Sequence, residues 1–137
     1  MKKIALLLII TLLCGACGNY QHDTIPYRKV DITLSVGDPN YYMLNHDGGY
    51  LYLTGGVNGI IVYRMLNEFK AYDRACPYDW ENSNSWLCYE PSELMIHDSC
   101  CGSRFNIIDG TVMNGPARHP LKYYRTSFDG MLLRIYN

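Results

Sequence analysis

The sequence predicts an all-β fold in which small antiparallel sheets stack into a sandwich or barrel. Two observations predict it. Short apolar runs alternate with polar residues at a period of two, and turn-forming residues separate these runs. No segment keeps the 3.6-residue periodicity of an amphipathic helix over several turns. The length of 137 residues allows one domain with a modest hydrophobic core.

The expected strands follow one another along the chain with short turns between them. Asp31 to Val36 alternates polar and apolar side chains, which is typical of a strand with one buried face. The run from Ile60 to Tyr63 is apolar throughout, which favours a strand buried on both faces. The remaining strands are expected at 41–44, 50–53, 69–73, 85–89, 93–98, 105–108, 111–113, 121–127 and 131–136.

The N-terminus has the features of an export signal. A basic start at residues 1–3 precedes an apolar stretch over 4–13, which is too short to span a bilayer. Small residues before Cys17 resemble the lipobox of bacterial lipoproteins, whose cysteine is acylated after cleavage, and Cys14 is the rival acceptor. We expect a signal peptide over 1–16, a tether over 17–27 and a domain over 28–137. The protein would be lipid-anchored to a bacterial envelope membrane; an ordinary signal peptide is the alternative.

Charge and motifs exclude several classes of function. The net charge is −1 and the charges are scattered, so the chain has no electrostatic footprint for nucleic acid and no polybasic membrane patch. No phosphate-binding glycine loop or nucleophile elbow is present. We therefore assign no catalytic residue, and if the protein has a redox role we expect an electron carrier.

Three segments carry the candidate functional site: ACPYD at 75–79, DSCCGSRF at 98–105 and NGPARHPL at 114–121. Their order resembles the Rieske iron–sulfur domain, in which a Cys-x-His loop and a Cys-x-x-His loop hold a [2Fe-2S] cluster under a proline-rich loop. The resemblance covers about residues 28–137. It implies three stacked antiparallel sheets with the cluster at one tip.

The resemblance places the four cluster-ligand positions at Cys76, Tyr78, Asp98 and Cys101. Tyr78 and Cys101 stand where the family has histidines, and Asp98 stands where it has its second cysteine. Oxygen donors match poorly with iron that is already bonded to soft sulfide. We therefore expect a degenerate site with no cofactor and no metal; a [2Fe-2S] cluster held by unusual ligands is the alternative.

Five further residues are expected to support the loops at this tip, by the same resemblance. They are Cys100, Gly102, Ser103, Gly115 and Pro116. Each also has a purely structural explanation: glycine permits a tight turn, serine caps a turn and proline braces the end of a sheet.

The domain contains four cysteines that an oxidising compartment would tend to pair, namely Cys76, Cys88, Cys100 and Cys101. If the fold is right, Cys76 and Cys101 lie on facing loops, and a bridge between them would add about 3 kcal/mol of stability. Cys76–Cys100 is the close variant. Cys88 is either a free thiol or the partner of the remaining loop cysteine.

A zinc site is an alternative use of these thiols. His97 and Cys100 are separated by two residues, and Cys76 with Cys101 or Cys88 would complete the ligand set. However, strand alternation places Leu94 and Ile96 on the core face and turns His97 toward solvent.

The function that follows is a membrane-anchored lipoprotein with a degenerate cluster site. We expect a non-catalytic domain that binds an unidentified envelope protein or has a structural role. The alternatives are an electron-transfer protein that holds a [2Fe-2S] cluster through unusual ligands, and a redox-active thiol protein that uses Cys76 with Cys100 or Cys101.

Overall fold

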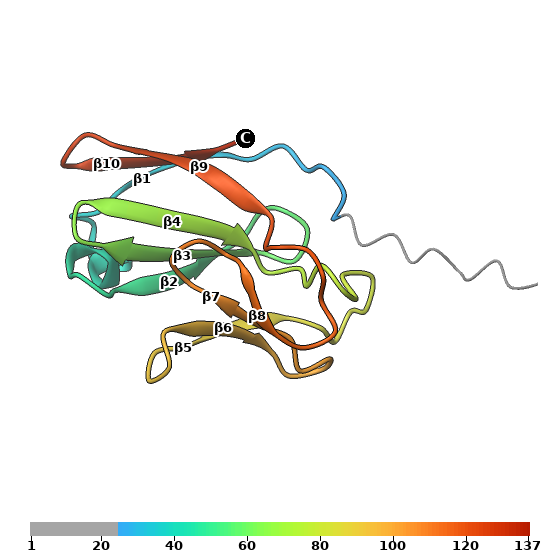
Figure 1. The fold of residues 1–137 in the computed structure, drawn as a ribbon. Helices are drawn as coiled ribbons and strands as arrows, with labels where there is room; N and C mark the ends of the chain where they lie inside the picture. Colours follow the sequence, from blue (N-terminus) through green and yellow to red (C-terminus); the bar gives the residue numbers. More distant parts are fainter. Residues whose placement is uncertain (1–24) are drawn as a thin grey trace, which may run out of the picture.

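The described part of the chain, residues 25–137 of this computed structural model, contains ten strands and one short 3-10 helix (Figure 1). The expected signal peptide and Cys17 lie outside it. No helix within residues 25–137 has the length and apolar character needed to cross a bilayer. The elements are β1 (Asp31–Ser35), η2 (Pro39–Asn45), β2 (Tyr50–Leu53), β3 (Ile60–Met65), β4 (Glu68–Asp73), β5 (Leu87–Glu90), β6 (Met95–Asp98), β7 (Arg104–Asn106), β8 (Val112–Asn114), β9 (Tyr123–Phe128) and β10 (Leu132–Tyr136).

The strands form three layers, as Figure 1 shows. A six-stranded sheet has the order β1-β10-β9-β4-β3-β2, and a separate four-stranded sheet has the order β5-β6-β7-β8. The six-stranded sheet folds over where β4 pairs with β9 through only two residue pairs, so β1, β10 and β9 lie above β4, β3 and β2. The four-stranded sheet covers the other side. All pairings within the described residues are antiparallel, which confirms the predicted fold class.

The middle layer is buried on both faces. Ile60 and Val62 of β3 point into one hydrophobic cluster, where they meet Leu133 of β10. Ile61 points the other way, into a second cluster that contains Phe105 of β7. The continuous apolar run of β3 therefore follows from its position between two layers, as the sequence predicted.

The strand predicted at 41–44 is wrong, because these residues belong to η2. Asp38 caps this helix by accepting a hydrogen bond from the Asn40 N–H at 2.8 Å, and Pro39 stands at its first position. A capping aspartate followed by proline is a helix-start signal. β2 pairs with β3.

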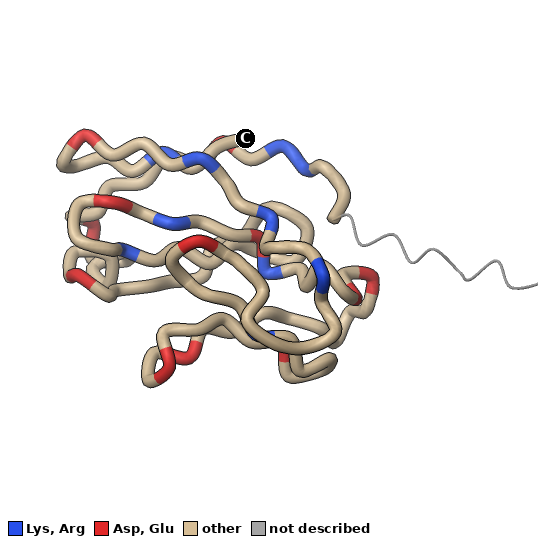
Figure 2. The backbone as a smooth tube through the Cα atoms, in the orientation of Figure 1, with Lys and Arg blue, Asp and Glu red and all other residues tan. Residues whose placement is uncertain are grey.

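Three loops converge at one end of the layers. They connect β4 to β5 (74–86), β6 to β7 (99–103) and β8 to β9 (115–122), and they carry the three segments that resemble cluster loops. Acidic and basic positions are dispersed along the backbone, with no long run of one sign (Figure 2). The exclusion of nucleic acid as a partner stays a prediction.

The carboxylate of Asp73 anchors the start of the first of these loops. It is fully buried at the end of β4 and accepts hydrogen bonds from the N–H groups of Val57 (2.7 Å), Asn58 (3.1 Å) and Ala75 (2.9 Å). It also accepts one from the Tyr124 hydroxyl at 2.6 Å, and this contact raises the pKa of Tyr124 further after burial has already raised it. One side chain thus ties β4, β9 and the glycine-rich loop at 54–59 together.

We predict that Asp73→Ala lowers the free energy of unfolding by about 3–5 kcal/mol, because it leaves one buried and two half-buried N–H groups without an acceptor. Tyr124→Phe removes one donor from the same network and should lower it by about 1–2 kcal/mol. Urea unfolding of both variants measures the difference. Equal losses in the two variants would contradict the anchoring role of the carboxylate.

Candidate functional site

The three segments that the sequence singled out meet at the loop tip. Cys76 of the first loop and Cys101 of the second face each other with their Sγ atoms 3.6 Å apart. The third loop joins them through Ala117, whose N–H donates to the Ser103 hydroxyl oxygen at 3.1 Å. The same oxygen accepts from the Cys101 thiol at 3.0 Å. Ser103 therefore links the second and third loops.

Asp98 shapes the second loop. It is the last residue of β6, shares the core face with Ile96 and is only 1% exposed. Its Oδ1 accepts from the N–H of Cys100 at 2.7 Å and from that of Cys101 at 3.3 Å, while its Oδ2 accepts from the Ser85 hydroxyl. Burial alone would raise the pKa of Asp98, but these hydrogen bonds outweigh it and hold the pKa below its usual range. The group is therefore a carboxylate at neutral pH.

A second carboxylate approaches the same point from the first loop. Asp79 Oδ1 lies 2.7 Å from the hydroxyl oxygen of Ser85, which is fully buried and also contacts Asp98. One hydroxyl has one proton, so Ser85 cannot donate to both carboxylates at once. Two negative groups are thus held side by side around a single neutral donor.

The Cys76 thiol completes the group. It is fully buried, and burial raises the pKa of Cys76 well above its usual range; the neighbouring Asp98 carboxylate and Cys101 thiol raise it further. Donor atoms of Cys76, Asp79, Asp98 and Cys101 all lie within 4.8 Å of one another. Tyr78, the fourth expected ligand position, packs against the second hydrophobic cluster, which also contains Cys76.

The four cysteines are free thiols in this structure. The expected Cys76–Cys101 bridge is not formed, because the sulfur atoms are 3.6 Å apart, whereas a disulfide bond is about 2.05 Å long. Cys100 is exposed and accepts from the Asn82 side chain at 3.2 Å, so it points away from Cys76. Cys88 is on β5, and its sulfur lies 3.9 Å from the guanidinium of Arg74.

The alternative zinc site does not assemble. Ile96 is buried and His97 lies on the other face of β6, as predicted, where it pairs with Cys88 and Arg104 across the sheet. His97 therefore does not reach Cys76. The expectation that Leu94 faces the core is wrong, because it has a φ of +53° in the turn before β6 and is 52% exposed.

The glycines of the second and third loops have different roles. Gly102 has a φ of +79°, and a Cβ there would meet nothing within 4 Å. Gly115 has a φ of +107°, and a Cβ there would lie 2.9 Å from the Ser103 nitrogen and closer still to its Cα. Gly115 thus permits backbone-to-backbone contact between the two loops, while the neighbouring Pro116 is exposed.

Comparison with known proteins supports the fold. No family model matches the chain, and no curated protein matches it. The solved structure of the ferredoxin of carbazole 1,9a-dioxygenase from Nocardioides aromaticivorans IC177 is similar, with a TM-score of 0.50 over 82% of this chain and 97% of that chain, at 15% identity. The fold is Rieske-like. A complex of reduced oxygenase and oxidized ferredoxin in carbazole 1,9a-dioxygenase matches with a TM-score of 0.45, 66% of this chain, 82% of that chain and 20% identity.

The expectation of no cofactor needs correction. Rieske-fold structures of the kind that this chain resembles bind [2Fe-2S] clusters, so absence of a cofactor is the wrong expectation for this fold. The residues of this chain nevertheless do not fit that particular cluster. Its ligands are four thiolates, or two thiolates and two imidazoles. Here the clustered donors are two thiols and two carboxylates, with no histidine among them in the described residues.

Two residues of the site were missed from the sequence, Asp79 and Ser85. Asp79 is not among the ligand positions that the resemblance implies, and Ser85 is only the first residue of the strand predicted at 85–89. A signal for Asp79 was present, since it follows Cys76 at the same spacing of two residues that separates Asp98 from Cys101. No local signal marked Ser85, because its contacts come from residues 6 and 13 positions away.

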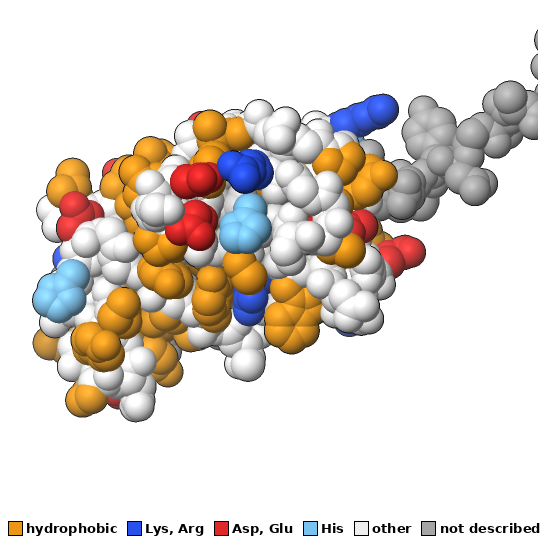
Figure 3. All heavy atoms as spheres, turned by 90° about the horizontal axis from the view of Figure 1, so that it is seen from below, with side chains coloured by type: hydrophobic (Ala, Val, Ile, Leu, Met, Phe, Trp, Pro, Cys, Tyr) orange, Lys and Arg blue, Asp and Glu red, His pale blue; other side chains and the backbone are white. Residues whose placement is uncertain are grey.

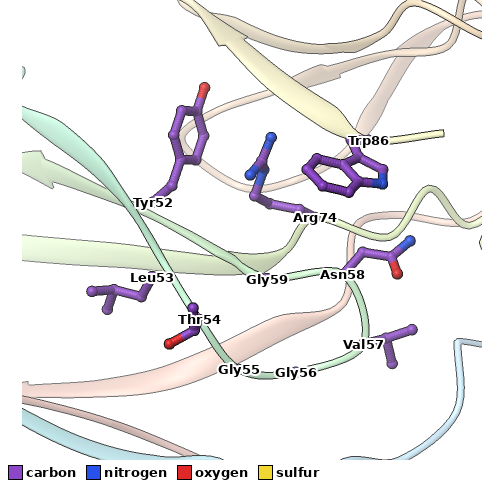
Figure 4. Close-up of a pocket in the computed structure, with 10 residues that line it drawn as sticks. All are labelled: Tyr52, Leu53, Thr54, Gly55, Gly56, Val57, Asn58, Gly59, Arg74 and Trp86. Carbon is purple, nitrogen blue, oxygen red and sulfur yellow. The ribbon is translucent and has the colours of Figure 1, made fainter. Parts of the chain in front are cut away.

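A pocket lies beside the tip. Tyr52, Arg74 and Trp86 line a pocket of about 500 Å³ whose floor is the glycine-rich loop (Figure 4). The sequence did not predict this pocket, because its three large side chains come from β2 and from both ends of the 74–86 loop. On the underside of the molecule, viewed in Figure 3, hydrophobic side chains are intermixed with acidic, basic and histidine side chains.

Substitution of the two glycines tests the packing of the third loop. We predict that Gly115→Ala lowers the free energy of unfolding by about 2–4 kcal/mol, because it adds a backbone clash to an unfavourable φ. Gly102→Ala is the matched control with strain alone, and should cost about 1–2 kcal/mol. Thermal unfolding gives both values, and hydrogen exchange at the Ala117 N–H should accelerate in Gly115→Ala. A larger loss in Gly102→Ala would contradict the contact.

Proposed function

We propose that this chain is a lipid-anchored protein of the bacterial envelope that uses its Rieske-like fold as a non-catalytic module for binding a protein partner. The observation that carries the proposal is the pocket formed by Tyr52, Arg74 and Trp86 beside the loop tip. The lipid anchor is supported by the lipobox-like sequence before Cys17.

The pocket is held in a fixed shape by hydrogen bonds. The Arg74 Nε donates to the Leu87 carbonyl at 2.9 Å, and its guanidinium carbon lies 4.1 Å from the centre of the Tyr52 ring. The Tyr52 hydroxyl accepts from the Tyr89 N–H at 3.1 Å. The indole N–H of Trp86 donates to the Ser83 carbonyl at 2.9 Å. A partner that binds to such a surface loses little affinity to side-chain ordering, because these side chains are already held in place.

The residue types are those that dominate binding energy in protein interfaces. Tryptophan, tyrosine and arginine are enriched at interface hot spots. Trp86 is 52% exposed and Tyr52 is 41% exposed, so both retain apolar surface that a partner could cover. Arg74 is the one charged side chain among the described residues that line the pocket. A partner with an acidic side chain would therefore complement it.

The alternative functions have less support from the geometry. A redox-active thiol needs a readily formed thiolate, but burial raises the pKa of Cys76. Electron transfer through a [2Fe-2S] cluster needs ligands that the tip does not present, since carboxylates stand in two of the donor positions. The binding pocket requires neither chemistry.

Site-specific photo-crosslinking tests the binding surface. In the full-length chain in bacterial cells, a photoreactive residue at position 86 should form a discrete adduct with one envelope protein. The control position is Tyr42, which is 61% exposed on η2, and it should give no such adduct. Once the partner is identified, Trp86→Ala should weaken its binding by about 10-fold to 30-fold. No adduct at 86, or the same adducts at 42, would contradict the proposal.

Metabolic labelling tests the anchor. Cells that express the full-length chain are grown with radioactive palmitate. The wild type and Cys14→Ser should become labelled, and Cys17→Ser should not. Acylation of Cys17 should also place the protein in the membrane fraction, because several acyl chains on one residue give stable anchoring. Equal labelling of Cys17→Ser would overturn the assignment of the lipid to this residue.

A further inference from the structure

Four donor groups from two loops surround one point at the tip. Cys76 and Asp79 come from the loop after β4, and Asp98 and Cys101 flank the turn after β6. Each residue offers one donor atom, and all four atoms lie within 4.8 Å of one another. Cys76 and Asp98 are buried, so these donors are fixed by packing. We propose that this group binds a single divalent transition-metal ion of the zinc class.

The spacing along the chain supports a mononuclear site. Two residues separate Cys76 from Asp79, 18 residues separate Asp79 from Asp98, and two separate Asp98 from Cys101. Structural zinc sites commonly take two ligand pairs of this kind, each pair two residues apart, with about 15–20 residues between the pairs. Here the outer member of each pair is a cysteine and the inner member is an aspartate. Thiolate and carboxylate are both zinc ligands.

The distances support the same conclusion. A tetrahedral ion with metal–sulfur bonds of about 2.3 Å holds two sulfur ligands about 3.8 Å apart. The Cys76 and Cys101 sulfur atoms are 3.6 Å apart, longer than a disulfide bond and close to this ligand–ligand edge. The ligands of a two-iron cluster must instead span two metal atoms and their bridging sulfides. The compact group therefore suits one ion better than a cluster.

Neighbouring groups orient the four donors. Ser85 contacts both carboxylates, and Asp98 Oδ1 also accepts from the Cys100 N–H. The Ser103 hydroxyl lies 3.0 Å from the Cys101 sulfur and can donate to it once the thiol has lost its proton. Such outer hydrogen bonds fix ligand orientation in metal sites.

Binding follows a simple balance. Each thiol loses its S–H proton to solvent as its S–metal bond forms, and the two carboxylates bind without losing a proton. The two positive charges of the ion replace those of the two released protons, so the net charge of the group does not change on binding. It also joins the loops after β4 and β6, where the expected disulfide is not formed. Asp79 replaces Tyr78 in the inferred ligand set, and neither His97 nor Cys100 takes part.

Metal titration of the full-length chain tests the proposal. The protein is purified under reducing conditions, stripped with a chelator and titrated with Zn²⁺ and then with Co²⁺. We expect one ion per chain by elemental analysis, and the Co²⁺ form should show thiolate-to-metal charge-transfer absorption with the intense visible bands of a tetrahedral site. Cys101→Ser should weaken Zn²⁺ binding by more than about 100-fold, the upper limit for loss of an outer partner.

The adjacent cysteine provides the matched control. Cys100→Ser removes an exposed thiol next to Cys101 and should leave affinity and spectrum unchanged. Asp79→Asn tests the set without disturbing the buried core, since Asp79 is half-exposed, and it should weaken binding while circular dichroism stays native. No bound ion in reduced wild type, equal binding by Cys101→Ser, two irons with sulfide, or a Cys76–Cys101 disulfide in protein purified without reductant would each overturn the proposal.

Discussion

A buried carboxylate must have a hydrogen-bond donor for each of its oxygens, and this constraint determines the functional end of the molecule. Asp73 and Asp98 both stand at the last position of a strand, on a face that otherwise holds apolar side chains. Each is satisfied by the backbone N–H groups of the chain that follows or faces it. The loops therefore take conformations that present N–H groups inward, and the thiols of Cys76 and Cys101 are placed as a result.

This arrangement explains how a Rieske-like tip keeps its shape with a different donor set. Asp98 stands where the resemblance predicts a ligand, and it holds the turn through the N–H groups of Cys100 and Cys101. Ser103 and Gly115 keep the third loop in contact with the second. The loop geometry thus rests on hydrogen bonds within the protein.

The tip and the pocket share one loop. Ser85 points inward to the carboxylates, and the next residue, Trp86, points outward into the pocket. Arg74 stands at the other end of the same loop and binds the Leu87 carbonyl, so it closes the loop on itself. A change at the buried donors would displace the ends of this loop and thereby the aromatic surface. Metal binding at the tip and partner binding at the pocket use different chemical groups, but both depend on the conformation of this loop.

The sequence by itself determined the fold class and most of the strands, and the resemblance of three segments to cluster loops predicted that Cys76, Asp98 and Cys101 would lie together. Periodicity records which face is buried, and the run at Ile60 to Tyr63 showed that β3 lies between two layers. The prediction of a strand at 41–44 was wrong, because Asp38 and Pro39 start a helix whose capping outweighs a weak strand pattern. Only the tertiary structure decided that Asp79 and Ser85 join the site and that Tyr52 and Trp86 line one pocket. Such contacts join residues from separate elements, and their geometry depends on how the layers pack; the spacing of Asp79 from Cys76 was the one local signal for any of them.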